Sequence, residues 1–479
     1  MPASPRSAIR NPQSARGPVA TVAACAGLLS ALTGCFSERA VPMRAGDYRP
    51  VTLPPDACGN AGATREWLAC VHPQLLSLIP NGDGRRALLT SNLSAGDGGP
   101  RDVFKYFGVR PENLHTIVGN LYGLMHTAQA AGADAGPQGA AAPWPGFEDV
   151  WVPVRAELEL SARLGLARDG GKVRTADCVV LIPGLMGDNN VKRTREIARA
   201  LRSAGFHVLA VELRGAGRTH RRYPHVRYTF GTLEVGDLLA VSEWLEDRPE
   251  VRRTGLIGYC WGANLALLCA WEDGRMDEDP DIDIRLRPYL RPRNGRRHYQ
   301  AGILAFSPVL RFEEMIETLD QRRWPRLENP VLDTLQTEIE TRMQREQFPE
   351  VSGSLRRLIE LEYERSELSY PQAVPDGLRY LRLMPSRDRT VGQKLETARV
   401  PVLIVHAAND PLSPAQDVAD FIATIDNPQV AAMVLPGGGH VGFVPYARAY
   451  TYSLMLNFFH PQYGAAACSE RGDLASQTE

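Results

Sequence analysis

Short apolar runs alternate with amphipathic stretches along the chain from about residue 150 onward. The runs are rich in Val, Ile, Leu and Ala over their whole length, which is typical of strands buried on both faces of a sheet. They lie at residues 178–182, 208–211, 254–258, 301–306, 400–406 and 430–435. Helical spacing of apolar positions follows at residues 191–203, 232–246, 263–268 and 446–459. Strands that alternate with helices predict an α/β fold, a mostly parallel sheet with helices on both faces.

Other parts of the chain depart from this pattern. Residues 150–154 and 158–166 read as an antiparallel hairpin that opens the sheet. Gly, Pro and Ala dominate the region before it, where residues 64–76 and 111–128 show short helical patches and residues 131–145 predict a linker or loose surface loop. We expect a leader at 1–34, an irregular, partly helical region at 35–147, a sheet core in two halves at 148–311 and 400–462, a helical insertion at 312–399, and a flexible tail at 463–479.

The insertion at residues 312–399 consists of charged helical segments between two strands of the sheet. Two positions for it are open. It folds over the carboxyl edge of the sheet as a cap, or it decorates the periphery away from any site.

The N-terminus predicts export from the cytoplasm. Three arginines within the first 16 residues precede an apolar run at 19–32, which is too short to span a membrane. The run ends in Leu-Thr-Gly-Cys at Cys35, which resembles a bacterial lipoprotein signal with Cys35 as the lipid-modified residue. Phe36 follows, so the aspartate linked with inner-membrane retention is absent and an outer-membrane anchor is expected. An ordinary secretory signal or an incidental apolar stretch are the alternatives.

Composition limits the classes of function. The chain has 479 residues, which is long enough to bury a large core. Its formal net charge of -1 gives no electrostatic reason to expect nucleic-acid binding. An acidic run at 277–283 followed by arginines at 285–297 reads as a solvated loop. Cys58 and Cys70 are compatible with a disulfide in an oxidising space, although the sequence does not establish the pairing. No Cys/His spacing predicts a metal site, and nothing implies an organic cofactor.

The segment Gly-Tyr-Cys-Trp-Gly at 258–262 has the form of a nucleophile elbow, G-x-S-x-G, with Cys260 in the place of serine. A predicted strand precedes it and a predicted helix follows it. The helix N-terminus would favour a thiolate and the oxyanion that it generates. The alternative is a Gly-rich turn with a buried cysteine.

Two further polar residues follow predicted strands, and their order makes the elbow more specific. Asp410 comes after the strand at 400–406, and His440 comes after the strand at 430–435. Open α/β sheets place their sites at the carboxyl ends of strands. The order nucleophile, acid, base therefore predicts a triad of Cys260, Asp410 and His440. By contrast, Asp237 reads as a surface or structural residue within a helix, and Cys269 reads as core.

Residues 150–460 resemble the α/β-hydrolase superfamily, and within it the esterase- and lipase-like branch. The resemblance rests on the segments at 182–187, 212–217, 258–262, 409–411 and 438–443. It implies that Cys260 attacks a carbonyl carbon, that His440 transfers the proton, and that Asp410 orients His440. It also implies an oxyanion hole made by the backbone N–H groups of Trp261 and Leu185.

Two departures from the family pattern bear on activity. Pro183-Gly184 stands where the family usually has His-Gly, and cysteine replaces serine at the elbow, as in dienelactone hydrolases, which the Gly-Tyr-Cys segment resembles. The expected function is hydrolysis of a carboxylic ester with a medium or lipid-like acyl group by a lipid-anchored protein. Two alternatives remain open: a dienelactone or thioester hydrolase, and a degenerate envelope lipoprotein that binds rather than cleaves. The sequence does not set the oligomeric state.

Overall fold

A computed structural model describes the parts of the chain that carry the sheet and its helices. All of them belong to the compact unit Met43–Glu479. The described residues are 48–51, 64–79, 88–89, 143–155, 157–184, 189, 192–226, 228–229, 231, 233–275, 297–312, 315, 356–357, 394–408, 410, 412–435 and 437–460.

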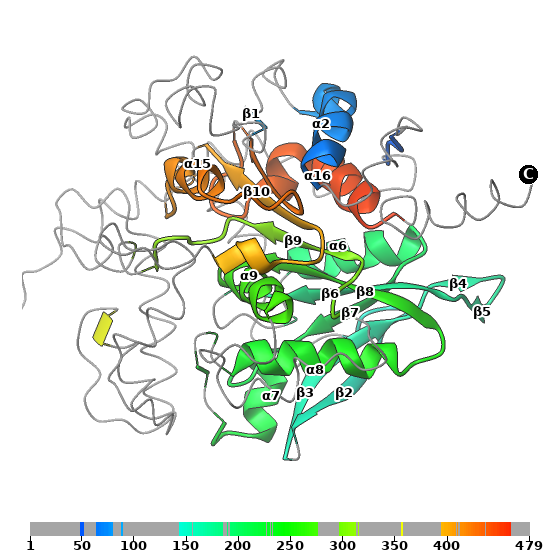
Figure 1. Ribbon diagram of the computed structural model, residues 1–479. Helices are drawn as coiled ribbons and strands as arrows, with labels where there is room; N and C mark the ends of the chain where they lie inside the picture. Colours follow the sequence, from blue (N-terminus) through cyan, green and yellow to red (C-terminus); the bar gives the residue numbers. More distant parts are fainter. Residues whose placement is uncertain are drawn as a thin grey trace, which may run out of the picture. The chain divides into compact units, whose positions relative to one another are not determined.

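A nine-stranded sheet runs through the described residues in the order β1-β11-β10-β9-β8-β6-β7-β3-β2 (Figure 1). The strands are β1 Leu88–Leu89, β2 Glu148–Arg155, β3 Leu158–Gly165, β6 Ala176–Ile182, β7 His207–Val211, β8 Val251–Tyr259, β9 Gly302–Phe306, β10 Val402–Ala407 and β11 Val430–Leu435. The six strands from β7 to β11 in this order pair in parallel. Strands β2 and β3 form the antiparallel hairpin at one edge. The predicted strands and the mostly parallel sheet are thus confirmed.

Helices cover both faces of this sheet, as the alternation of strands and helices predicts. They are α2 Thr64–Leu75, α6 Lys192–Ser203, α7 Gly217–Arg222, α8 Glu234–Glu246, α9 Trp261–Gly274, α15 Ala415–Ala423 and α16 Phe443–Phe458. Short elements complete the described set: the 3-10 turns η3 Leu76–Leu78 and η7 Lys394–Thr397, and a separate hairpin of β4 Arg168–Asp169 and β5 Lys172–Val173.

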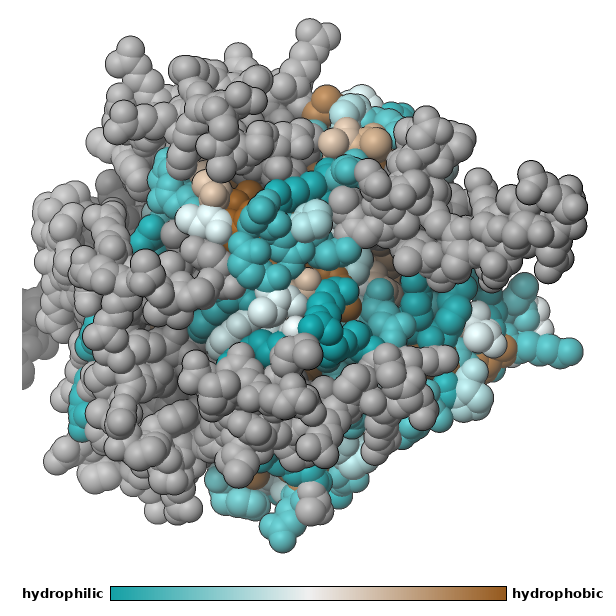
Figure 2. Space-filling view, in the orientation of Figure 1, coloured by the Kyte–Doolittle hydropathy of each residue, from teal (hydrophilic) through white to brown (hydrophobic). Residues whose placement is uncertain are grey.

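Two hydrophobic cores lie on the two sides of the sheet because successive strand residues point to opposite faces. In β6, Val180 belongs to the core that includes residues of α8, α9 and α15, whereas its neighbours Val179 and Leu181 belong to the core that includes residues of α2, α6 and α16. The strand is fully buried, which explains its unbroken apolar sequence. Charged and polar residues make up most of the described surface that Figure 2 shows.

The N-terminal helix predicted at 64–76 is present as α2, and it packs against the sheet core. Its residue Arg65 donates hydrogen bonds to the carbonyl oxygens of Val430 and Ile425, at 3.0 and 2.6 Å. Ahead of it, Val51 donates from its backbone to Asn457 Oδ1 on α16, at 3.2 Å. These contacts join the described part of the N-terminal region to the last strand and helix of the fold.

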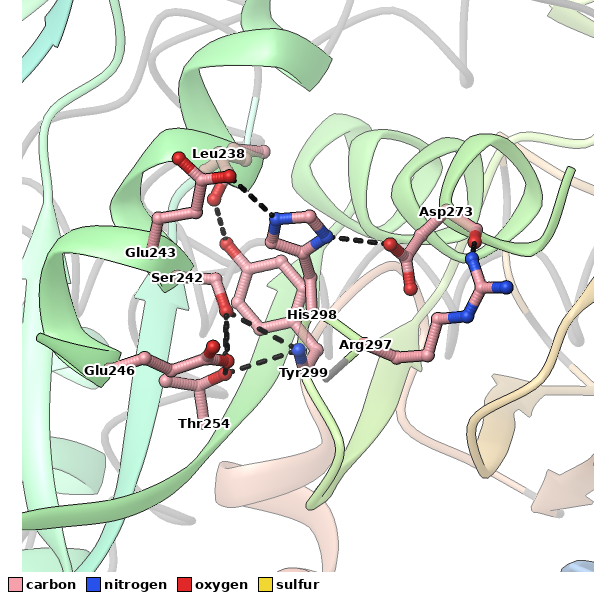
Figure 3. Close-up of polar contacts among 9 residues, drawn as sticks. All are labelled: Leu238, Ser242, Glu243, Glu246, Thr254, Asp273, Arg297, His298 and Tyr299. Carbon is pink, nitrogen blue, oxygen red and sulfur yellow. Dashed lines mark hydrogen bonds and ion pairs between the residues drawn. The ribbon is translucent and has the colours of Figure 1, made fainter. Parts of the chain in front are cut away.

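A buried polar cluster connects α8 and α9 with the segment that enters β9 (Figure 3). His298 lies between Asp273, whose Oδ1 is 2.6 Å from Nδ1, and Glu243, whose Oε1 is 3.4 Å from Nε2. The next residue, Tyr299, donates its hydroxyl to the Leu238 carbonyl and its backbone N–H to the side chain of Thr254. The cluster therefore joins α8, α9 and the segment before β9 through buried hydrogen bonds.

Several sequence predictions concern residues outside the described ranges. The leader, Cys35, the tail and most of the charged loop are among them, and so is most of the predicted cap at 312–399. Cys70 has a free thiol, and Cys58 lies outside the described residues. No helix within the described ranges is long and apolar enough to cross a membrane.

Candidate active site

Cys260 occupies the turn between the end of β8 and the first residue of α9. Its backbone has φ 54° and ψ -120°. Residues other than glycine rarely adopt this conformation, which costs about 1–3 kcal/mol. The surrounding structure holds this conformation. The Cys260 N–H donates to the Phe306 carbonyl at 2.9 Å, and the Cys260 carbonyl accepts from Ala263 N–H at 2.9 Å. The turn thus presents the thiol at the carboxyl edge of the sheet.

The two glycines of the elbow lie where a side chain would not fit. A Cβ at Gly258 would lie 2.2 Å from the Gly262 carbonyl oxygen, and a Cβ at Gly262 would lie 2.3 Å from the Pro183 carbonyl oxygen. Both contacts are with backbone atoms, which have little freedom to move aside. The close approach of β6, β8 and α9 explains why glycine stands at these two positions of the motif.

Asp410 and His440 meet beyond the ends of β10 and β11. His440 Nδ1 lies 3.0 Å from Asp410 Oδ2 and 3.2 Å from Oδ1. Asp410 Oδ1 also accepts the backbone N–H groups of Leu412 and Ser413, at 2.9 and 3.1 Å. Both side chains are buried. The loop before His440 turns at Gly438 and Gly439, which have φ values of 127° and 54°.

The electrostatics link the three side chains. Burial of the Cys260 thiol opposes ionisation, but the charge of His440 and its hydrogen bond outweigh it, so the pKa of Cys260 lies below its ordinary value. Burial likewise opposes the charged form of His440, yet Asp410 and Cys260 together raise the pKa of His440 to about 10. Burial opposes ionisation of Asp410, but the charge and hydrogen bond of His440, the charge effect of His406 and the Leu412 N–H outweigh it and lower the pKa of Asp410 to about 2. Each of the three shifts favours the ionised form of its side chain: a thiolate at Cys260, an imidazolium at His440 and a carboxylate at Asp410.

The predicted oxyanion donors are only partly described. The backbone N–H of Trp261 hydrogen-bonds the Cys260 thiol, so it already faces the reacting sulfur. Leu185 lies outside the described residues. The preceding Gly184 is described, and a Cβ placed there would lie 3.9 Å from the Cys260 sulfur and 3.4 Å from its Cβ. The loop after β6 therefore passes directly beside the nucleophile.

Other polar residues of the sequence lie elsewhere. Asp237 is fully buried and receives two hydrogen bonds of 2.6 Å from the guanidinium of Arg214, so its structural interpretation holds and its surface alternative is wrong. Cys269 is buried in the core, as predicted. No group of His, Cys, Asp and Glu within the described ranges has the arrangement of a metal site.

Two supporting residues were not recognised in the sequence. Asn264, in the first turns of α9, donates to the Val309 carbonyl at 2.7 Å and accepts its N–H at 2.8 Å. Ser307 has φ 49° at the end of β9, and its hydroxyl lies 3.4 Å from the backbone N of Val441. An amide within an apolar helix start and a serine after a buried strand are the sequence signals that would have indicated them.

A cavity of about 460 Å³ lies away from these residues. It is lined by the end of α9, including Arg275, and by the segments 396–399 and 426–428 that lead into β10 and β11. The cavity lies where β10 and β11 begin, whereas Cys260 lies where β8 ends, so the cavity does not belong to the candidate site.

Comparison with known proteins adds one informative match. Residues 179–450 match the model of the Alpha/beta hydrolase family, which is more than half of the chain. No curated protein matches the sequence.

Solved structures of hydrolases are similar at low identity. An esterase from Pyrococcus furiosus is 18% identical with a TM-score of 0.39, over 65% of this chain and 91% of that one. Est1E from Butyrivibrio proteoclasticus is 14% identical with a TM-score of 0.37, over 65% and 96%. A 2,6-dihydroxy-pseudo-oxynicotine hydrolase is 13% identical with a TM-score of 0.44, over 72% of each chain.

Proposed function

Because the chain belongs to the alpha/beta hydrolase family, we propose that it cleaves carboxylic esters through an acyl-enzyme on Cys260. The observation that carries the proposal is the linked set of Asp410, His440 and Cys260, in which the carboxylate lies 3.0 Å from the ring and the ring lowers the pKa of the thiol. A thiolate is intrinsically a strong nucleophile, so cysteine serves at this position without a change in the rest of the site.

The first half of the reaction forms the acyl-enzyme. The Cys260 thiolate attacks the ester carbonyl carbon, and the carbonyl electron pair moves to oxygen. The Trp261 N–H, which faces the sulfur in the resting state, then has the developing oxyanion within its reach. The C–O bond breaks as the oxyanion collapses, and the leaving alkoxide takes a proton from His440.

The second half releases the acid. Water attacks the thioester while His440 takes one of its protons, and collapse of the second tetrahedral intermediate breaks the C–S bond. The carboxylic acid leaves and Cys260 returns to the thiolate. Asp410 keeps its charge throughout, because the low pKa of this carboxylate favours the ionised form beside the imidazolium.

Hydrolysis of chromogenic esters tests the proposal. Wild-type protein, Cys260→Ala and the control Cys70→Ala, which removes a free thiol outside the triad, are assayed with short- and long-chain acyl esters and with thioesters. We expect turnover by the wild type and the control and none by Cys260→Ala. Equal rates for Cys260→Ala and wild type would refute the triad.

The same assay separates the alternatives for the substrate. Faster cleavage of thioesters or unsaturated lactones than of simple esters would favour the dienelactone or thioester hydrolase. Absence of turnover with every substrate, together with no acyl label on Cys260 after incubation with an activated ester, would favour a protein that binds without cleaving.

We also propose that the protein is anchored by lipid outside the cytoplasm, which the leader and the box at Cys35 support. Bacteria that express the full chain are grown with an alkyne-labelled palmitate. Label and membrane association are expected for the wild type and absent from Cys35→Ala. Label on both proteins, or on neither, would refute Cys35 as the lipidated residue.

A further inference from the structure

A second histidine lies beside the acid of the triad. His406 is the penultimate residue of β10, and its side chain is fully buried. Its Nε2 lies 2.8 Å from the Ser413 carbonyl oxygen and 3.8 Å from Asp410 Oδ2. The ring is therefore bonded to the turn that carries Asp410, and it is too far from the carboxylate to compete with His440 for it.

The turn from Asp410 to Ser413 depends on few contacts. Asp410 N–H donates to the Ala407 carbonyl at 3.2 Å, and Asp410 Oδ1 accepts the N–H groups of Leu412 and Ser413. The carbonyl of Ser413 is the point at which the far end of the turn is tied back to β10, and His406 makes that tie. Displacement of Ser413 would withdraw one of the two backbone donors from Oδ1 and so weaken the contacts that orient the carboxylate.

The charge state of His406 suits this contact. Burial lowers its pKa below the ordinary value, against the opposing effects of Asp410 and of the Ser413 hydrogen bond, and the charge of His440 acts in the same direction as burial. A neutral ring that donates from Nε2 leaves Nδ1 as an acceptor. In the part of the chain that the structure describes, this buried Nδ1 has no hydrogen-bond partner, so Nε2 carries the ring's one polar contact there.

We propose that His406 is a positioning residue for the acid of the triad: its Nε2–H holds the Ser413 carbonyl, which keeps the Leu412 and Ser413 N–H groups on Asp410 Oδ1 and leaves Oδ2 to His440. The consequence for ester cleavage rests on the proposed function. The consequence for the reactivity of Cys260 does not, because the thiol responds to His440 and Asp410 whether or not an ester is the substrate.

Two substitutions separate the N–H group from the bulk of the ring. His406→Gln keeps a side-chain N–H at a similar reach, and His406→Leu fills the space without a donor. The pH dependence of Cys260 alkylation by iodoacetamide is measured in both variants and in the wild type, with the Cys260 peptide quantified by mass spectrometry. Asp410→Asn marks the profile of a site that has lost its acid.

We expect the pH midpoint of Cys260 alkylation in His406→Gln to equal that of the wild type. In His406→Leu the midpoint should move towards that of Asp410→Asn. Where ester turnover is present, kcat of His406→Leu should fall by about tenfold or more with KM changed by less than about twofold, because a misplaced acid affects the transition state and not binding. The glutamine variant should recover most of this kcat.

An alkylation profile of His406→Leu identical to the wild type would overturn the proposal. An equal shift of the pH midpoint in His406→Leu and His406→Gln would overturn it as well. Should His406→Leu fail to fold, His406→Asn replaces it, since its shorter amide cannot reach Ser413. A protein without ester turnover would contradict the proposed function alone, because the alkylation profiles still decide the role of His406.

Discussion

The substitution His298→Gln removes an imidazolium that α8 and α9 share. His298 is buried between Asp273 and Glu243, at 2.6 and 3.4 Å. Burial by itself would lower the pKa of His298, but the hydrogen bonds and charges of the two carboxylates outweigh it and raise the pKa to about 9. Glutamine can still donate a hydrogen bond to Asp273, so the substitution mainly deletes the charge.

The size of the effect follows from linkage. A group whose pKa rises on folding adds stability that is complete below its unfolded value, 6.5 for this histidine, and that disappears as the pH rises through its folded value of about 9. At about 1.4 kcal/mol for each pH unit, this interval corresponds to about 3 kcal/mol as an upper bound. We therefore expect His298→Gln to lower the free energy of unfolding by up to about 3 kcal/mol at pH 6 and by much less at pH 10.

Urea unfolding followed by circular dichroism, at intervals from about pH 6 to pH 10 across this linkage window, measures the difference between variant and wild type. Groups that titrate in both proteins cancel in that difference. His225 is an exposed histidine, and His225→Gln should stay within about 0.5 kcal/mol of wild type at every pH. A gap between His298→Gln and wild type that does not change with pH would refute the reasoning.

Three further predictions test the site and its supports. Gly262→Ala should lower the free energy of unfolding by about 1–3 kcal/mol, because its Cβ would lie 2.3 Å from the Pro183 carbonyl oxygen; urea unfolding at the wild-type midpoint would contradict this. Arg214→Leu should lower the free energy of unfolding by about 3–5 kcal/mol, because it leaves the buried carboxylate of Asp237 without its main partner. The double variant with Asp237→Leu should recover part of this stability, as measured by thermal unfolding. Asp410→Asn should reduce kcat for esters by about 10⁴-fold with little change in KM; an activity within about tenfold of wild type would show that the acid is elsewhere.

The strands and most helices were predictable because their signals are local. Unbroken apolar runs marked the parallel strands within a few residues, and β11 was predicted with its observed bounds, 430–435. Helix α15 at Ala415–Ala423 was missed, since its nine residues follow Asp410 so closely that the stretch reads as part of the loop. The position of the predicted cap stays a prediction.

The order of Cys260, Asp410 and His440 could also be derived from the sequence, but the residues that support them could not. Asn264 holds Val309 across 45 positions, and His406 acts on a backbone carbonyl rather than on a side chain. A polar residue in an apolar segment indicates that it has a partner, but the sequence does not indicate which distant residue that partner is. The burial of Asp237 was missed for the same reason, because it depends on Arg214, which lies 23 residues earlier in the segment between β7 and α7.

The docking of α2 has a consequence for the synthesis of this protein. Arg65 and its carbonyl partner at Val430 are 365 residues apart in the chain, so this early helix waits until β11 has left the ribosome before it acquires that contact. At about 5–20 residues per second, the delay lasts tens of seconds. During that interval the apolar face of α2, with Trp67, Leu68 and Val71, has no native surface to cover it. A chain that is kept unfolded until synthesis ends would avoid exposing a half-formed fold with this helix unpaired.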